Sequence, residues 1–189
     1  DDNIVLANVY DNLLCLENDG SLSYALAESY DLNPEGTIYT FHLRKGVRFT
    51  DGTPMTPEDV KFSLDKGAAG PLGGPLLINY KETRIIDDHT IEVELTAPYA
   101  AFPYCVASRV GGIASKKYWE RVGDDGYMEK PIGTGPYKLV AYAANDYVTL
   151  EANDDHWRGA PSIKTIQIEL VADPNTMILG LQNGDYDVM

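Results

Sequence analysis

The sequence has little positive charge and no long hydrophobic run. Fifteen Lys and Arg residues stand against 29 Asp and Glu residues, which gives a formal net charge of −14 in 189 residues. An acidic field repels phosphate backbones, so this balance argues against nucleic-acid binding. The longest uncharged runs, residues 67–80 and 95–108, contain proline and fall short of the roughly 18 apolar residues that a membrane span needs. We therefore expect neither a nucleic-acid partner nor a membrane span.

Cysteine is scarce as well. The two residues, Cys15 and Cys105, could form an exported disulfide or remain two buried thiols, and the low count favours the thiols. The chain opens with Asp1 and Asp2, where a signal peptide would carry a positively charged region, so we predict no signal peptide within it.

Nothing in the sequence has the pattern of a catalytic centre. An activated nucleophile needs a base within reach, yet there is no G-x-S-x-G elbow and neither cysteine has a catalytic context. His42, His89 and His156 lie far apart, so we expect them to be solvated or structural, and no ligand spacing joins them to the cysteines. The carboxylate pairs at 87–88, 124–125 and 154–155 are expected in solvated turns. We predict no enzyme activity, no cofactor and no metal site.

Hydrophobic periodicity predicts an α/β chain of mixed α+β character, with hairpins instead of strict strand–helix alternation. Residues 67–75 are rich in Gly and Pro and predict a surface loop. Helices are predicted from Ser115 to Gly123 and from Asp173 to Gly184. Strands are predicted over residues 39–43, 84–86, 91–95, 137–142, 147–151 and 166–170.

The sharpest local signal is a helix start at Thr56. Thr56 is a good N-cap, Pro57 suits the first helical position, and Asp59 can reach back to the amide of the cap. The pattern predicts a helix that runs to about Lys66. The apolar residues expected on its buried side are Val60, Phe62 and Leu64.

A glycine pair precedes the strand predicted at residue 137. Gly133 and Gly135 resemble a phosphate-binding loop at first sight, but Pro136 leads into a strand, whereas a dinucleotide fingerprint opens a helix. The segment is better interpreted as a tight turn that starts an edge strand. We expect Gly133 or Gly135 to need a positive φ.

Several motifs, in a fixed order, resemble a known family. The resemblance is to the extracytoplasmic solute-binding proteins of ABC importers, family 5, in the dipeptide, oligopeptide and nickel branch. The motifs run in this order: Val9-Tyr10-Asp11-Asn12-Leu13-Leu14, Asp19-Gly20, Leu26-Ala27-Glu28-Ser29-Tyr30, Tyr39-Thr40-Phe41-His42-Leu43-Arg44-Lys45-Gly46-Val47-Arg48-Phe49, Asp51-Gly52-Thr53-Pro54, Glu58-Asp59-Val60-Lys61-Phe62-Ser63, Asp87-Asp88-His89-Thr90, Pro131-Ile132-Gly133-Thr134-Gly135-Pro136-Tyr137, Asn153-Asp154-Asp155-His156-Trp157 and Leu181-Gln182-Asn183-Gly184-Asp185-Tyr186-Asp187.

The resemblance implies a two-lobed periplasmic-binding-protein fold of type II, with the ligand buried between the lobes. It also implies an N-terminal fragment that holds part of lobe I and the family's small extra domain, because family members continue into a second large lobe. We expect residues 1–13 to belong to lobe I, 14–112 to form the small extra domain, and 113–189 to return to lobe I and end at the hinge.

Candidate ligand-binding residues lie where the chain would meet the missing parts. They are Asp2 and Asn3, expected before the first helix, and Asp187 and Met189, expected on a strand that heads for the hinge. Two departures from the family pattern, Tyr24 for Pro and His156 for Tyr, are interpreted as packing changes.

The implied function is capture of a small solute, a peptide in the first instance, outside the cytoplasmic membrane, and its delivery to ABC permease subunits. The location would be the periplasm or the cell surface, with membrane contact only through the permease or a lipid anchor outside this fragment, as in a lipoprotein. Two alternatives stay open: a carboxylate-based hydrolase on the same fold, and a peptide receptor or sensor that is not coupled to import. The nickel branch also leaves open a chelated metal or a sugar as the solute.

Overall fold

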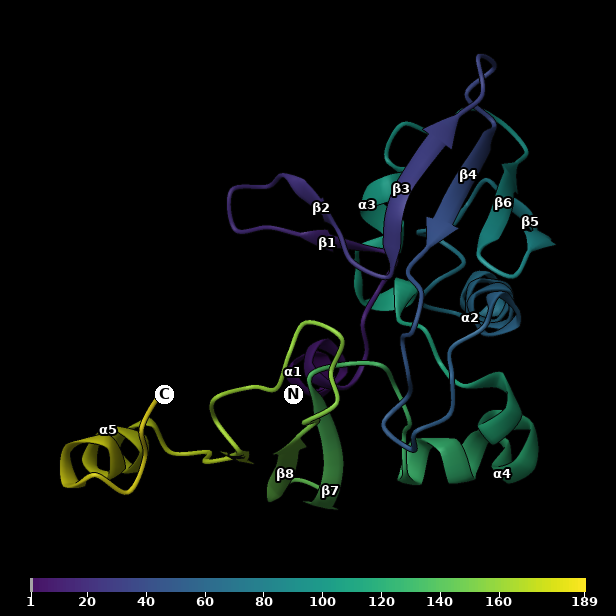
Figure 1. Ribbon diagram of the computed structural model, residues 1–189. Helices are drawn as coiled ribbons and strands as arrows, with labels where there is room; N and C mark the ends of the chain where they lie inside the picture. Colours follow the sequence, from purple (N-terminus) through teal and green to yellow (C-terminus); the bar gives the residue numbers. More distant parts are fainter. Residues whose placement is uncertain (1) are drawn as a thin grey trace.

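The computed structural model describes residues 2–189, with the side chains of residues 5–189, and its largest sheet has four antiparallel strands (Figure 1). The strand order is β3-β4-β6-β5, so β4 and β6 are the central pair. The strands are β3 (Ala27–Leu32), β4 (Ile38–Leu43), β5 (Tyr80–Asp87) and β6 (Thr90–Leu95).

The central pair explains the alternating sequence pattern. Tyr39 lies opposite Val93 and Phe41 opposite Ile91, and all four side chains are buried. Alternate residues of a strand face opposite sides of its sheet, so these apolar side chains form one face. The strands predicted over residues 39–43 and 91–95 are confirmed.

Helix α2 (Pro57–Ala69) begins as the capping pattern predicts. The backbone N–H and the hydroxyl of Thr56 both donate to Asp59 Oδ2, at 2.8 Å each. Asp59 is only 5% exposed, and its Oδ1 accepts from the N–H of Lys116 at 2.8 Å. The capping carboxylate therefore also joins α2 to the helix that starts at residue 116. The helix continues to Ala69, three residues into the predicted loop.

The buried side of α2 differs in part from the expectation. Val60 and Leu64, one turn apart, are buried, whereas Phe62 is half-buried and lies 5.6 Å from the Trp119 ring of α4 (Lys116–Glu129). Including Phe62 in the core face was wrong, because residues two apart point to different sides of a helix. Helix α4 is kinked at Gly123, with φ 74°, at the residue where the sequence predicted an end.

A short hairpin, β1 (Leu14–Leu16) and β2 (Leu22–Tyr24), precedes the large sheet and projects sideways from it (Figure 1). Leu14 is buried at its base, while Leu16 and Tyr24 are about half exposed. The base contacts helix α3 (Phe102–Val106), which is followed by the single turn η1 (Arg109–Gly111).

A second sheet of three antiparallel strands, in the order β7-β8-β9, lies beside helix α1. Helix α1 packs on β7, with Val9 buried between them. The predicted hairpin and third strand are confirmed. The elements are α1 (Asp2–Val9), β7 (Tyr137–Ala143), β8 (Tyr147–Ala152) and β9 (Thr165–Glu169).

The turn before β7 is confirmed, but the reason given for its glycines is wrong. Neither Gly133 nor Gly135 is among the residues with positive φ. A Cβ on Gly133 would lie 2.0 Å from the carbonyl oxygen of Val9, and one on Gly135 would lie 2.5 Å from that of Asn8. These positions need glycine because the turn passes directly over the end of α1.

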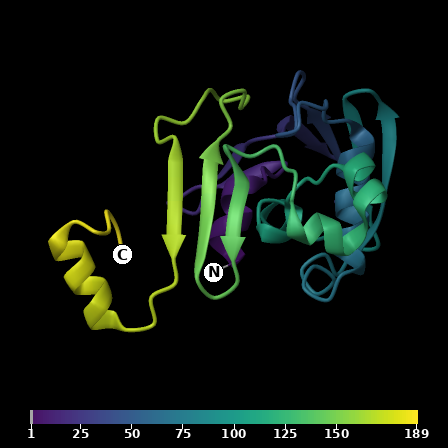
Figure 2. The same ribbon diagram turned by 90° about the horizontal axis from the view of Figure 1, so that it is seen from below.

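Helix α5 (Pro174–Asn183) follows β9 on the far side of the second sheet from α1, as Figure 2 shows. The side chain of Asp173 caps its first turn and Gly184 ends it in the left-handed conformation, as the sequence predicts. Ile178 and Leu179 of this helix remain exposed.

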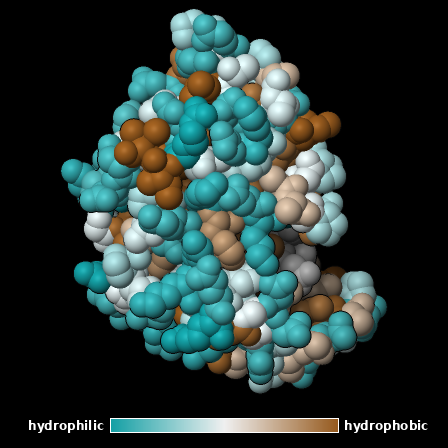
Figure 3. All heavy atoms as spheres, turned by 90° about the vertical axis from the view of Figure 1, so that its right-hand side faces the viewer, coloured by the Kyte–Doolittle hydropathy of each residue, from teal (hydrophilic) through white to brown (hydrophobic). Residues whose placement is uncertain are grey.

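Two apolar clusters lie inside the chain. The smaller is formed by Val9 with Tyr137, Leu150 and Ala152. The larger one fills the space between the four-stranded sheet, α2 and α3, and also takes in Ile113 and Ile132. On the face that carries β5, β6, α2 and α4, hydrophilic side chains cover most of the surface and the apolar patches are separate (Figure 3). Among the helices of residues 2–189, none is both long enough and apolar enough to cross a membrane.

Candidate functional site

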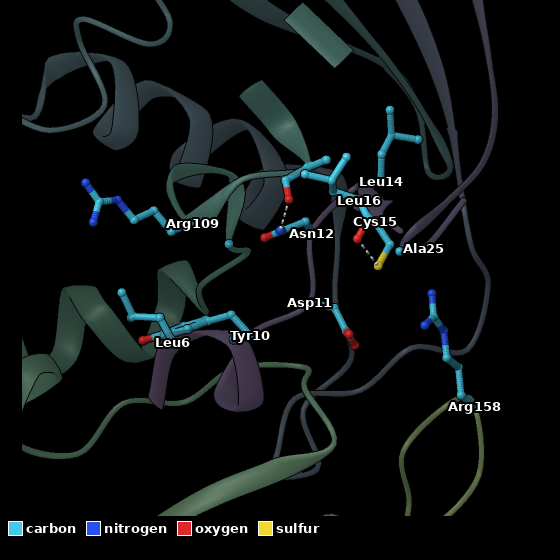
Figure 4. Close-up of a pocket in the computed structure, with 13 residues that line it drawn as sticks. Leu6, Tyr10, Asp11, Asn12, Leu14, Cys15, Leu16, Ala25, Arg109 and Arg158 are labelled. Atoms are coloured by element: carbon cyan, nitrogen blue, oxygen red, sulfur yellow. Dashed lines mark hydrogen bonds between the residues drawn. The ribbon is translucent and has the colours of Figure 1, made fainter. Parts of the chain in front are cut away.

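An open hollow of about 370 Å³ lies between the end of α1, the base of the β1–β2 hairpin and the turn η1 (Figure 4). Its wall is mixed, with aliphatic side chains beside charged and amide groups. The lining residues are Leu6, Ala7, Tyr10, Asp11, Asn12, Leu14, Cys15, Leu16, Ala25, Ala107, Arg109, Gly112 and Arg158.

The floor of the hollow is the connection between α1 and β1, residues 10–13, which is fixed on both sides. Asn12 Nδ2 donates to the Ala107 carbonyl at 3.0 Å, and the carbonyl of Asn12 accepts from the N–H of Leu26 at 3.0 Å. The carbonyl of Asp11 accepts from the N–H of Ile113, also at 3.0 Å. The floor is therefore a rigid strip of backbone, which suits a preformed binding site.

Asp11 is held in place by two donors. His156 Nε2 lies 3.0 Å and Trp157 Nε1 lies 2.7 Å from the same oxygen, Oδ2. The side chains of His156 and Asp11 are 5% and 13% exposed. His156 is thus structural, as expected, but its interpretation as a packing change was incomplete, because it makes a specific polar contact. His42 pairs with Asp31 at an exposed site.

Two arginines place their guanidinium groups over the ring of Trp157. Arg44 lies 4.4 Å and Arg158 lies 4.5 Å from the centroid of its ring. Cation–π contacts of this kind hold an arginine in a defined direction. Arg158 also donates to the carbonyl of Tyr24 at 3.4 Å, across to the end of the hairpin.

Arg109 and Tyr10 form the opposite side of the hollow. In Figure 4 the side chains of Arg109 and Arg158 stand at opposite ends of the labelled group. Burial raises the pKa of Tyr10 to about 12, and its phenol hydrogen-bonds with the buried Tyr127 of α4, so Tyr10 contributes only its ring to the wall. The hollow therefore offers the guanidinium of Arg158 to a small polar solute.

A second hollow lies between α4 and β7. It is larger, at about 550 Å³, and is lined mainly by apolar and aromatic residues. Its charged residues are only Glu129 and Lys130, at the end of α4. Because a binding site needs several polar groups that converge, we take the first hollow as the candidate site.

Of the residues predicted from the sequence to bind ligand, Asp187 and Met189 do not line this hollow. The backbone of Asp2 and Asn3 lies within α1, not before it as expected, and their side chains lie outside the described residues. Asp187 and Met189 are exposed and follow α5 without forming a strand, which corrects the expected strand at the hinge. In both ribbon views α1 and the segment after α5 stand apart, so the structure does not bring the two pairs together (Figures 1 and 2).

Sequence reasoning missed the residues that do line it. Tyr10, Asp11 and Asn12 belong to the first quoted motif and were not considered as site residues. Arg109 begins the single turn η1 and Arg158 lies between β8 and β9, and only their positive charge in an acid-rich chain could have drawn attention to them. The hollow joins segments about a hundred residues apart in the sequence, and no local pattern predicts that.

The cysteines and the possible metal ligands were the remaining groups to place. Both cysteines are free thiols: Cys105 is buried and Cys15 is half-buried in the wall of the hollow. Among the side chains of residues 5–189, the structure shows no cluster of three or more His, Cys, Asp and Glu groups that could hold a metal ion.

Comparison with known proteins identifies the family. The model of the bacterial extracellular solute-binding proteins, family 5 Middle, matches residues 21–189. The glutathione-binding protein GsiB of Escherichia coli K12 is 33% identical over 187 residues, which cover 96% of this chain and 36% of GsiB. The chain thus spans little more than a third of this curated relative.

Solved structures of binding proteins have the same fold as this chain over nearly its whole length. MoaA from A. tumefaciens R10, in complex with mannopinic acid, matches with a TM-score of 0.89 at 27% identity, over 98% of this chain and 39% of MoaA. DppA from Helicobacter pylori, an ABC transporter-associated periplasmic binding protein in complex with the peptide STSA, matches with a TM-score of 0.84 at 28% identity, over 96% of this chain and 40% of DppA. The chain belongs to the bacterial extracellular solute-binding proteins of family 5 and carries part of their type II periplasmic-binding-protein fold, as the order of its motifs predicted.

Proposed function

We propose that this chain is part of the solute-binding component of an ABC import system, which captures a small peptide outside the cytoplasmic membrane and delivers it to the permease. The observation that carries the proposal is the hollow at the end of α1, in a chain that belongs to a family of binding proteins. Its volume, about 370 Å³, lies within the range of pockets that hold small molecules.

A peptide suits the chemistry of the wall. Peptides carry an anionic end, amide groups and apolar side chains, and the hollow offers the Arg158 guanidinium, the Asn12 amide and the aliphatic side chains of Leu6 and Leu14. Two relatives point the same way, since GsiB is named for glutathione and DppA was solved with a peptide. The relatives are binding proteins, which favours capture without turnover over the hydrolase alternative.

The proposal extends to the organisation of the chain. Residues 1–13 and 113–189 belong to lobe I, and residues 14–112 form the small extra domain. The smaller apolar cluster supports this division, because it joins Val9 of α1 to β7 and β8, while the larger cluster crosses the boundary through Ile113 and Ile132. The remaining ligand contacts come from a second lobe, and we keep Asp2, Asn3, Asp187 and Met189 as candidates for the rim that faces it. The mature protein would work in the periplasm or as a lipid-anchored protein at the cell surface.

The test is an NMR chemical-shift titration of the ¹⁵N-labelled chain, which detects affinities as weak as millimolar. The probes are glutathione and trialanine, with glucose as a non-peptide comparison. Peptide binding predicts saturable shifts at residues around the hollow. Ala7 lines the first hollow and Ala141 the second, and both are exposed, so Ala7→Phe and Ala141→Phe form a matched pair.

We expect Ala7→Phe to abolish the shifts and Ala141→Phe to leave them unchanged. Binding that survives Ala7→Phe would contradict the placement of the site. A response to glucose but to neither peptide would contradict the peptide assignment. Mass spectrometry of solute retained by a longer form of the protein during purification would then name the natural ligand.

A further inference from the structure

Arg158 has no anionic partner within the described part of the chain. Its guanidinium rests 4.5 Å from the centroid of the Trp157 ring, and its only hydrogen bond among residues 2–189 is the long one of 3.4 Å to the carbonyl of Tyr24. No carboxylate oxygen of the described residues lies within 4.0 Å of its nitrogens, although the chain has 29 acidic residues and only 15 basic ones. Arg48 and Arg121 also have no ion pair among those printed for the described residues, but only Arg158 of these three lines the hollow.

The orientation of the Arg158 side chain is set by its contact with Trp157, which is itself held by hydrogen bonds. Trp157 is fixed by the 2.7 Å bond from its Nε1 to Asp11 Oδ2, and Asp11 is fixed in turn by His156 at 3.0 Å. Arg44, 4.4 Å from the Trp157 ring, further restricts the indole. Arg158 therefore reaches the hollow as a pre-oriented cation at the hairpin end, and little side-chain entropy is lost when it binds an anion.

The charges around the hollow determine what this cation can recognise. Asp11 is the one carboxylate in the lining, and its Oδ2 already accepts from His156 and Trp157. The net charge of −14 repels anions at long range, but that field is screened beyond about 8–10 Å at physiological salt. A direct contact with a guanidinium, planar and able to bind a carboxylate through two parallel N–H bonds, works at shorter range.

We propose that Arg158 is a specificity residue that pairs with a carboxylate of the bound solute, so that the chain prefers peptides with an acid group at the hairpin end of the hollow. This inference rests on the proposed function and deepens it. Trp157 is a positioning residue, since it acts through the orientation of Arg158.

The experiment compares four peptides by the same chemical-shift titration: Ala-Glu-Ala and Ala-Gln-Ala, each as the free acid and as the C-terminal amide. Together they carry two, one or no carboxylates on one backbone. The chain should bind the best acid-bearing peptide about tenfold more tightly than Ala-Gln-Ala amide, as expected for one charge-assisted contact at an exposed site. Arg158→Gln should reduce this preference to less than twofold, and Arg158→Lys should keep part of it.

Arg121→Gln is the matched control. Arg121 is exposed on α4, 5.0 Å from the Tyr118 ring and outside the hollow, and its loss changes the net charge equally. The preference should survive in Arg121→Gln. If the wild-type chain binds all four peptides equally, or if both variants lose the preference equally, the inference is wrong while peptide capture stands. If none of the four binds at 10 mM or below, either to this chain or to a longer form of the protein that includes the second lobe, peptide capture fails and the inference fails with it.

Discussion

Alanine at Gly133 should strongly destabilise the chain, because of contact and not because of backbone conformation. The turn at residues 133–135 passes over the end of α1 so closely that a Cβ on Gly133 would lie 2.0 Å from the Val9 carbonyl oxygen, where ordinary contact begins at 3.4 Å. Relief requires a shift of more than an ångström between the turn and the helix. Both partners are backbone, so no side-chain rotation can accommodate the methyl group.

The hydrogen bonds of the turn make that shift costly. The N–H of Gly135 donates to the same Val9 oxygen at 3.0 Å, and the carbonyl of Gly133 accepts from Thr50 at 2.9 Å. Overpacking costs about 1–3 kcal/mol and each lost hydrogen bond about 1 kcal/mol. We expect Gly133→Ala to lower the free energy of unfolding by about 3 kcal/mol. Gly135→Ala, with its closest contact at 2.5 Å, should cost about 2 kcal/mol.

Urea unfolding followed by tryptophan fluorescence measures these values, provided that the slope of the transition is unchanged. Gly52→Ala is the control for backbone strain, since Gly52 has φ 83° and nothing within 4 Å of its Cβ position. It should cost about 1–2 kcal/mol from conformation alone. The reasoning is refuted if Gly133→Ala is no more destabilising than Gly52→Ala.

Three further outcomes are expected. Thr56→Ala should lower stability by about 1 kcal/mol in the same urea assay, and Thr56→Ser, which keeps the hydroxyl, should stay near wild type; an unchanged midpoint for the alanine variant would contradict the capping role. The hydrogen bond from Lys81 to Glu94 holds the pKa of Glu94 below its ordinary value of 4.5. Its contribution is therefore complete above pH 4.5 and is lost as the pH falls further, so Glu94→Gln should flatten that part of a plot of Tm against pH; equal slopes would show that the pair does not matter. Iodoacetamide should label Cys15, half-buried in the wall of the hollow, well before the buried Cys105, and equal labelling rates in the folded chain would contradict the burial described here.

Local patterns in the sequence determined much of the secondary structure. The cap at Thr56, the alternation in β4 and β6, and the stop at Gly184 depend on neighbours within a few residues, so the sequence alone predicts them. The family was also readable from the sequence, since the motifs retain their order along the chain. Local chemistry and motif order are properties of the chain before it folds.

Tertiary structure decided what depends on contacts between distant segments. The need for glycine at 133 and 135 comes from Val9 and Asn8, more than a hundred residues earlier, and the sequence analysis wrongly assigned it to the turn itself. The partner of His156 is Asp11, 145 positions away. The hollow likewise joins residue 11 to Arg109 and Arg158, which lie about 100 and 150 positions further along the chain. Burial and close approach depend on which surfaces meet after folding. The pattern within one segment does not specify which distant segment it will contact.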